Sequence, residues 1–171
     1  GIPIAIKDLE DTQGIRTTYG SKIFETHVPK EDGIIAKRIR DAGAILIGKT
    51  NTPEFGVGSH TFNPVFGPTR NPYNRQLSAG GSSGGAASAI AANFVPVADG
   101  SDMMGSLRNP AAFNNIYGFR PTVGVVPSEQ EDLNVSDSLS TAGPMAKTPR
   151  DLGYLLHVIA GSDQLGKISS D

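Results

Sequence analysis

Three short segments of the sequence place reactive polar side chains beside apolar ones. Lys7 ends the apolar run of residues 4–6, and a lysine is rarely buried unless it is paired or used in chemistry. The glycine-rich run 80–85 contains two adjacent serines, and Ser106 follows an apolar stretch at a predicted turn. Burial lowers the pKa of a lysine, and a neutral lysine can activate a serine hydroxyl. The segments therefore offer a base and a hydroxyl nucleophile.

Each segment also has a purely structural interpretation. Lys7 could extend its side chain from the end of a strand into solvent. The run 80–85 could form an ordinary turn or a nest of backbone amides that binds an anion. Ser106 could cap a helix, since serine is a favoured capping residue, or successive amides at its turn could point at one oxygen, as an oxyanion hole requires. The residues alone leave these alternatives open.

The composition excludes several classes of function. The 171 residues carry 15 Lys and Arg against 17 Asp and Glu, a net charge of -2, so no overall basic field attracts nucleic acid or anionic lipid. The sequence has no cysteine, which excludes disulfides, thiolate zinc sites and a cysteine nucleophile. No apolar run approaches the roughly 20 residues of a membrane span, and no signal-peptide pattern is visible. We therefore expect a cytoplasmic protein without nucleic-acid or membrane partners.

Alternating strand and helix patterns predict one α/β domain over residues 1–171. Apolar runs predict strands at 4–6, 44–47 and 94–98, and the second run is apolar enough for a fully buried strand. Amphipathic or alanine-rich patterns predict the helices, which are 29–42, one that begins near Thr52, 83–92, 106–113 and 149–160. Strands that alternate with helices favour a largely parallel or mixed sheet covered by helices.

Two motifs match known patterns in the wrong context. Residues 43–50 match the phosphate-loop pattern G-x-x-x-x-G-K-[ST], but their middle residues are themselves a predicted strand. Residues 81–85 match the G-x-S-x-G nucleophile elbow, but a polar stretch precedes them instead of an apolar strand. A serine-histidine triad would need His157, which falls in an amphipathic helix. We expect neither a phosphate loop nor an α/β-hydrolase triad.

Six segments in one order resemble the amidase signature family, and together they cover most of the chain. The segments are 1–8 (GIPIAIKD), 48–55 (GKTNTPEF), 80–85 (GGSSGG), 102–111 (DMMGSLRNPA), 117–122 (YGFRPT) and 143–148 (GPMAKT). The resemblance implies a mixed β-sheet core flanked by helices. It also implies the hydrolysis of carboxylic amides without a metal or cofactor.

The resemblance also implies a role for particular residues. Ser106 is similar to the family's acyl-forming nucleophile, Ser82 to a bridging serine held by a cis peptide, and Lys7 to the base. Gly81 and Ser83 are similar to supporting residues. The amides of Met103, Met104, Gly105 and Ser106 would hold the oxyanion.

Met104 departs from the family pattern, which usually has two glycines before the nucleophile. Only backbone amides are needed at these positions, so catalysis survives if the turn does not require a positive φ at Met104. The methionine side chain would then narrow or line the substrate pocket.

Three functional hypotheses follow. The main one is a stand-alone amidase acting on a small-molecule amide, because residues 51–55 and 106–110 look like those of general amidases. The alternative within the family is the glutaminase (A) subunit of a tRNA-dependent amidotransferase. The third is a non-catalytic module that binds an anion at 80–85. The sequence leaves open whether the protein forms a homo-oligomer.

The length and the ends of the chain predict a portion of a longer amidase domain. Family members are about two to three times this length, by the size expected of large α/β enzymes. The chain opens on an apolar strand with nothing before it and closes on the polar residues 166–171. We therefore expect residues 1–171 to be the catalytic portion, with N- and C-terminal parts missing.

Overall fold

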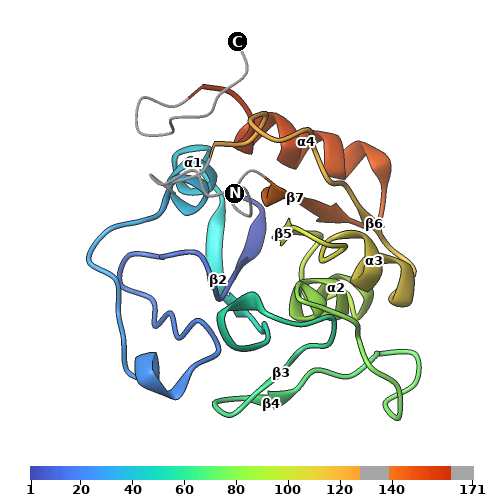
Figure 1. Ribbon diagram of the computed structural model, residues 1–171. Helices are drawn as coiled ribbons and strands as arrows, with labels where there is room; N and C mark the ends of the chain where they lie inside the picture. Colours follow the sequence, from blue (N-terminus) through green and yellow to red (C-terminus); the bar gives the residue numbers. More distant parts are fainter. Residues whose placement is uncertain (128–138, 163–171) are drawn as a thin grey trace.

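The fold is built on a mixed β-sheet with helices on both faces (Figure 1). The structure is a computed structural model that describes residues 1–127 and 139–162. Residues 166–171, whose polarity suggested a cut end, lie outside the described residues. The predicted α/β class with a mixed sheet is confirmed.

Among the described residues, five strands form the central sheet in the order β2-β1-β5-β7-β6. β1 runs parallel to both β2 and β5, whereas β7 is antiparallel to β5 and to β6. The strands are β1 (Pro3–Lys7), β2 (Ile45–Thr50), β5 (Val97–Asp102), β6 (Tyr117–Gly118) and β7 (Thr141–Ala146). A separate hairpin pairs β3 (Phe62–Asn63) with β4 (Gly67–Pro68).

The helices cover the sheet in two pairs, and β1 shows which pair covers which face. Side chains alternate between the two faces along a strand. Ile4 and Ile6 pack with α1 (Ile34–Asp41) and α4 (Pro149–Ile159). Ala5 packs with α2 (Gly84–Ala91) and α3 (Arg108–Phe113). The same alternation places Lys7 on the α2 face, where the glycine-rich run 80–85 enters that helix.

The predicted helices at 83–92 and 149–160 are present as α2 and α4. Thr148 caps α4, because its hydroxyl accepts a hydrogen bond from the Asp151 amide. Leu155 and Ile159 are buried on the inner face of this helix. Among the described residues, no helix is long and apolar enough to cross a membrane.

Two predicted strands differ from the structure. The run 44–47 was predicted to be fully buried, but Ile45 and Ile47 of β2 are 55% and 54% exposed. β2 pairs only with β1 in the described sheet, so it is an edge strand. The predicted strand 94–98 begins later, at Val97, and continues to Asp102.

Three predicted helices are shorter in the structure. The helix predicted at 106–113 begins at Arg108. α1 begins at Ile34 and not at residue 29, because Gly33 has extended backbone angles and forms the N-cap. The helix predicted to begin near Thr52 is reduced to a 3-10 turn at Glu54–Gly56. Phe55 interrupts it with a φ of 52°, which an α-helix cannot contain. A further 3-10 turn, at Lys22–Phe24, was not predicted.

Candidate active site

Lys7 is buried at the end of β1 and its amine is surrounded by serine hydroxyls. The side chain is 1% exposed, which contradicts the alternative in which it reaches solvent. Nζ donates hydrogen bonds to the hydroxyl oxygens of Ser82 at 2.7 Å, Ser83 at 3.0 Å and Ser101 at 3.0 Å. An ammonium group has three N–H donors, so the site satisfies the charged form, and on deprotonation one hydroxyl can donate to the amine in return.

The environment of Lys7 suits a base that works near neutral pH. Burial lowers the pKa of Lys7 from 10.5 to about 7, although the negative charges of Asp99 and Asp102 act to raise it. A general base is most effective when its pKa lies near the working pH. Lys7 therefore meets the electrostatic requirement for a base.

The proton of the Ser83 hydroxyl has its own acceptor. Ser83 Oγ donates to the carbonyl oxygen of Ser101 at 3.3 Å and accepts the Ser101 amide at 3.3 Å. Its oxygen is thus an acceptor for Lys7 and not a proton donor to it. The hydroxyl of Ser82, at the shortest distance from the amine, is better placed to give up a proton.

Backbone amides of the glycine-rich run 80–85 donate hydrogen bonds to the segments around it. The Gly81–Ser82 peptide bond is cis, the geometry that the family resemblance implies for this serine. The next amides donate within the protein, from Ser83 to Ser106 O at 3.3 Å, from Gly84 to Thr61 Oγ1 at 3.1 Å and from Gly85 to Asn51 O at 3.2 Å. Because these amides already have acceptors, the arrangement argues against an anion-binding nest.

Close backbone packing explains why glycine stands at the start of α2. A Cβ atom on Gly85 would lie 2.3 Å from the backbone nitrogen of Asn51, and one on Gly81 would lie 2.8 Å from the backbone carbonyl carbon of His60. Neither backbone atom can move aside as a flexible side chain could. The glycines let the serine-bearing segment approach the residues after β2.

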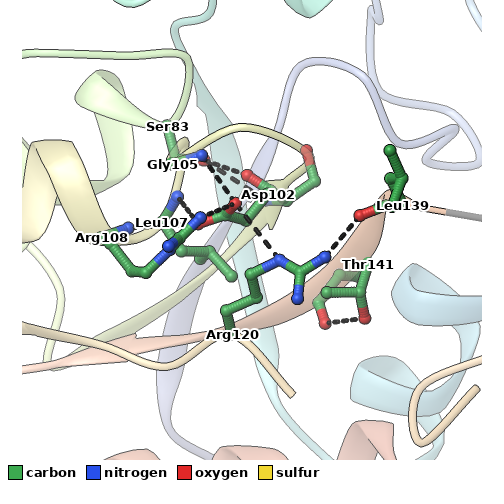
Figure 2. A network of polar contacts seen from close by, with 10 residues as sticks. Ser83, Asp102, Gly105, Leu107, Arg108, Arg120, Leu139 and Thr141 are labelled. Carbon is green, nitrogen blue, oxygen red and sulfur yellow. Dashed lines mark hydrogen bonds and ion pairs between the residues drawn. The ribbon is translucent and has the colours of Figure 1, made fainter. Parts of the chain in front are cut away.

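The turn that carries Ser106 is anchored on the buried carboxylate of Asp102 (Figure 2). Asp102 accepts the Gly105 amide at 2.8 Å and the Leu107 amide at 3.1 Å. Arg108 adds two hydrogen bonds at 3.0 Å, and Arg120 makes an ion pair at 3.4 Å. Burial alone would raise the pKa of Asp102, but these hydrogen bonds, led by that from Arg108, lower it to about 2.

The same turn contains the four amides that were predicted to hold the oxyanion. The Gly105 amide is engaged by Asp102, so it is not free in this conformation. The amides of Met103, Met104 and Ser106 have no acceptor among the described residues. The positive φ of the turn falls on Gly105, at 119°, and not on Met104, so the departure at Met104 does not strain the backbone. Its side chain is 89% exposed.

The structure brings Ser106 beside the glycine-rich run but does not link all three predicted triad residues. The carbonyl oxygen of Ser106 accepts the Ser83 amide, which joins the two segments. Within the described part of the chain, however, the Ser106 hydroxyl makes no hydrogen bond to Ser82 or Lys7. The contact between Lys7 and Ser82 is therefore in place, while the nucleophilic role of Ser106 stays a prediction.

Two residues of the site were missed in the sequence. Ser101 contacts the Lys7 amine, and Asp99 accepts the Lys7 amide at 2.8 Å. Both lie in β5 beyond residue 98, where the apolar pattern ends. Their polar types inside a continuing strand were the available signal, because a polar residue on a buried strand needs a partner.

The rejected phosphate-loop motif has a structural role. Residues 45–50 form β2. Lys49 donates to the Glu10 carbonyl, to Thr12 Oγ1 at 2.6 Å and to Thr17 Oγ1 at 3.1 Å, so it holds the loop that follows β1. Over residues 1–127 and 139–162, no cluster of three or more acidic or histidine side chains could hold a metal ion.

Comparison with known proteins gives one consistent family. A family model described as Amidase matches residues 1–171. The A subunit of the glutamyl-tRNA(Gln) amidotransferase of Acidothermus cellulolyticus is 48% identical over 171 residues, which are 100% of this chain and 34% of that protein. The chain thus spans about a third of the length of the curated relatives it matches.

Solved structures share the fold at similar identity. The A subunit of the glutamyl-tRNA(Gln) amidotransferase of Thermotoga maritima superposes with a TM-score of 0.90 at 38% identity, over 99% of this chain and 37% of that one. The peptide amidase of Stenotrophomonas maltophilia superposes with a TM-score of 0.90 at 39% identity, over 98% of this chain and 35% of that one.

Proposed function

Because this chain belongs to the amidase signature family, we propose that it hydrolyses carboxylic amides through an acyl-enzyme formed on Ser106. The observation that carries the proposal is the buried contact between the Lys7 amine and the Ser82 hydroxyl, which are 2.7 Å apart. A serine hydroxyl is a weak nucleophile unless an adjacent base takes its proton. A lysine with a pKa of about 7 supplies that base at neutral pH, and Ser82 supplies the connection to Ser106.

In the proposed acylation, two linked proton transfers accompany the formation of one bond to carbon and the breaking of another. The neutral Lys7 amine takes the proton of Ser82, Ser82 takes the proton of Ser106, and Ser106 Oγ bonds to the amide carbon. The amides of Met103, Met104 and Ser106 stabilise the negative oxygen that develops. As the carbon–nitrogen bond breaks, the proton on Lys7 returns through Ser82 to the leaving nitrogen.

Deacylation repeats the sequence with water. Water gives a proton through Ser82 to Lys7 as its oxygen bonds to the acyl carbon. The ester bond to Ser106 then breaks, and the proton returns to Ser106 Oγ. The products are the amine and the carboxylic acid. Both half-reactions require a hydrogen bond between the Ser106 and Ser82 hydroxyls when substrate is bound.

We favour glutamine as the amide, so that the products are glutamate and ammonia and the protein works as the glutaminase (A) subunit of a tRNA-dependent amidotransferase. Curated relatives described as the A subunit of glutamyl-tRNA(Gln) amidotransferase are 45% to 48% identical to this chain. Their names support this alternative better than the stand-alone amidase preferred from residues 51–55 and 106–110. This proposal includes an assembly with partner subunits.

A stand-alone amidase is the second candidate, and Met104 favours it. Its side chain is 89% exposed next to the proposed nucleophile, where an apolar group would contact an acyl chain better than a charged amino acid. The likeness to a peptide amidase at 39% identity supports the same candidate.

The test compares the intact protein with its Ser106→Ala and Ser88→Ala variants. Ser88 is the matched control, because it lies on α2 outside the site and its hydroxyl donates to the Arg70 carbonyl. We expect a fluorophosphonate to label Ser106 in the wild type and in Ser88→Ala, and ammonia release to cease in Ser106→Ala. Undiminished turnover in Ser106→Ala would overturn the proposal, whereas phosphate binding without any labelling would favour the anion-binding module.

The substrate is decided by comparing glutamine with linear and peptide amides. Faster turnover of glutamine, and partner subunits that co-purify with the protein, support the amidotransferase assignment. Faster turnover of other amides by the isolated protein supports the stand-alone amidase.

A further inference from the structure

Asp99 is a buried carboxylate that contacts the backbone of the proposed base. It lies in β5, is 4% exposed, and its Oδ1 accepts the backbone amide of Lys7 at 2.8 Å. The paired residues of β1 and β5 end at Ala5 and Ala98. The Asp99 side chain therefore adds a hydrogen bond between the two strands beyond their last paired residues. It makes this bond to Lys7, whose side chain carries the proposed base.

The alternation of side chains along the strands places Asp99 and the Lys7 side chain on opposite faces of the sheet. Asp99 is two residues after Val97, which packs on the face of α1 and α4, whereas Lys7 is two residues after Ala5, which packs on the face of α2. Side chains two apart share a face. Lys49 pairs with Ile6 in the register of β1 and β2, which places it on the Asp99 face. The carboxylate thus lies behind the strand that carries the base.

The charged groups around Lys7 come from few elements. β5 contributes Asp99 and Asp102, β2 contributes Lys49, and Asp8 follows Lys7 directly in the chain. Glu10 and Asp11 act on Lys49. α2 and β7 contain no ionisable side chain over their described lengths. Asp99 is accordingly one of two carboxylates whose charge acts on the Lys7 amine.

The pKa of Asp99 is raised above its ordinary value, with burial as the largest cause. The Lys7 amide and the charges of Lys49 and Lys7 act to lower it. In turn the charge of Asp99 raises the pKa of Lys7, against the larger effect of burial. Removing that charge should leave Lys7 with a still lower pKa.

We propose that Asp99 is a positioning residue for Lys7, which it serves by holding the Lys7 backbone and by keeping a negative charge behind the amine. The inference rests on the proposed function, in which Lys7 is the base. Asp99 touches neither Ser82 nor Ser106 through any hydrogen bond in the described part of the chain. It acts through Lys7.

The test separates the charge of Asp99 from its role as an acceptor. Asp99→Asn keeps an oxygen for the Lys7 amide and removes the charge, and Asp99→Ser does the same with a smaller side chain. Asp11→Asn is the matched control, because Asp11 acts on Lys49 but not on Lys7. The measurement is the pH dependence of kcat/KM for amide hydrolysis by the intact protein, with circular dichroism to check folding.

In Asp99→Asn, we expect the acid limb of the kcat/KM profile to move to lower pH by about one unit, the scale of losing a nearby opposite charge. The profile of Asp11→Asn should match that of the wild type. An unchanged profile in a folded, active Asp99→Asn overturns the inference, since the carboxyl would then serve as an acceptor only. Loss of folding in both neutral variants also overturns it, because it assigns Asp99 a structural role. Turnover that persists in Ser106→Ala instead overturns the proposed function.

Discussion

The Gly105 amide donates to Oδ1 of Asp102 over 2.8 Å, which ties the turn before Ser106 to a carboxylate buried under it. The Leu107 amide, on the other side of Ser106, donates to the second oxygen of the same carboxylate. Asp102 therefore holds the residues on both sides of the proposed nucleophile, Gly105 and Leu107 (Figure 2). Amides stabilise an oxyanion best when they are oriented before the reaction begins, so we infer that Asp102 prepares the turn for catalysis.

Replacing Asp102 should weaken both the fold and catalysis. In Asp102→Ala, three backbone amides and the Arg108 guanidinium lose a charged acceptor, so we expect the free energy of unfolding to fall by at least about 2 kcal/mol. We expect kcat to fall by about 100-fold, the scale of losing one oriented oxyanion donor. Urea denaturation and steady-state kinetics measure the two effects. Equal losses in Arg108→Gln would assign them to the exposed guanidinium instead.

The stability that Asp102 contributes should depend on acid pH. Its pKa is lowered from 3.8 to about 2 in the folded protein. Its contribution is therefore complete above pH 3.8 and is lost as the pH falls toward 2. Urea denaturation from pH 5 to pH 2 should show the wild type losing its advantage over Asp102→Asn in this range. A constant difference would contradict the assignment.

Lys7 should make both activity and stability depend on pH. As a base it works when neutral, so kcat/KM should rise with pH through about 7, the pKa that burial imposes. The unfolded chain holds this proton up to the ordinary value of 10.5. Between these two pH values the unfolded state binds more protons, so the wild type should gain stability relative to Lys7→Met by about 1.4 kcal/mol per pH unit.

The Lys7 prediction is checked by denaturation of both proteins from pH 6 to pH 10. The stability difference should be flat below pH 7 and should change above it in favour of the wild type. A difference that is flat throughout would show that Lys7 keeps its ordinary pKa. Such a result would remove the base from the proposed mechanism.

The parts of the fold that follow from local residues could be predicted. The alternation of Ile4, Ala5 and Ile6 marks a strand, and Thr148 marks the start of α4. Exposure of Ile45 and Ile47 could not be predicted, because it depends on which element covers β2 and not on the apolar types of the residues. The φ of 52° at Phe55 likewise has no local sequence signal.

The candidate site divides in the same way. Lys7, Ser82 and Ser106 stand out because reactive side chains occur in glycine-rich or apolar surroundings. Ser101 and Asp99 do not, because their contacts with Lys7 arise when β1 pairs with β5, across more than 90 residues of sequence. A pairing of this kind is a property of the sheet topology.

Met104 should affect substrate choice more than stability. Its side chain is 89% exposed, and its φ is not positive, so we expect Met104→Ala to change the free energy of unfolding by less than about 0.5 kcal/mol. If the side chain contacts the acyl group, KM for amides with apolar acyl chains should rise while KM for glutamine changes little. Kinetics on both substrate classes measure this, and equal effects on both would contradict a role in specificity.

Two glycines in helices should respond in opposite ways to alanine. In α2, a Cβ on Gly85 would meet the Asn51 nitrogen at 2.3 Å and its carbonyl oxygen at 2.5 Å. Gly85→Ala must therefore push apart the segment of Ser82 and the end of β2, and we expect a loss of about 1–3 kcal/mol in stability, typical of overpacking, together with a loss of activity. In α4, a Cβ on Gly153 meets nothing within 4 Å.

Gly153→Ala is thus the matched control for Gly85→Ala. Alanine loses less conformational freedom than glycine on entering a helix, so we expect this variant to gain about 0.5–1 kcal/mol in stability and to keep full activity. Thermal denaturation and amide hydrolysis of both variants test the pair. A tolerated Gly85→Ala would mean that the glycine-rich run does not need its close approach to Asn51, and that the position of Ser82 beside Lys7 is set by other contacts.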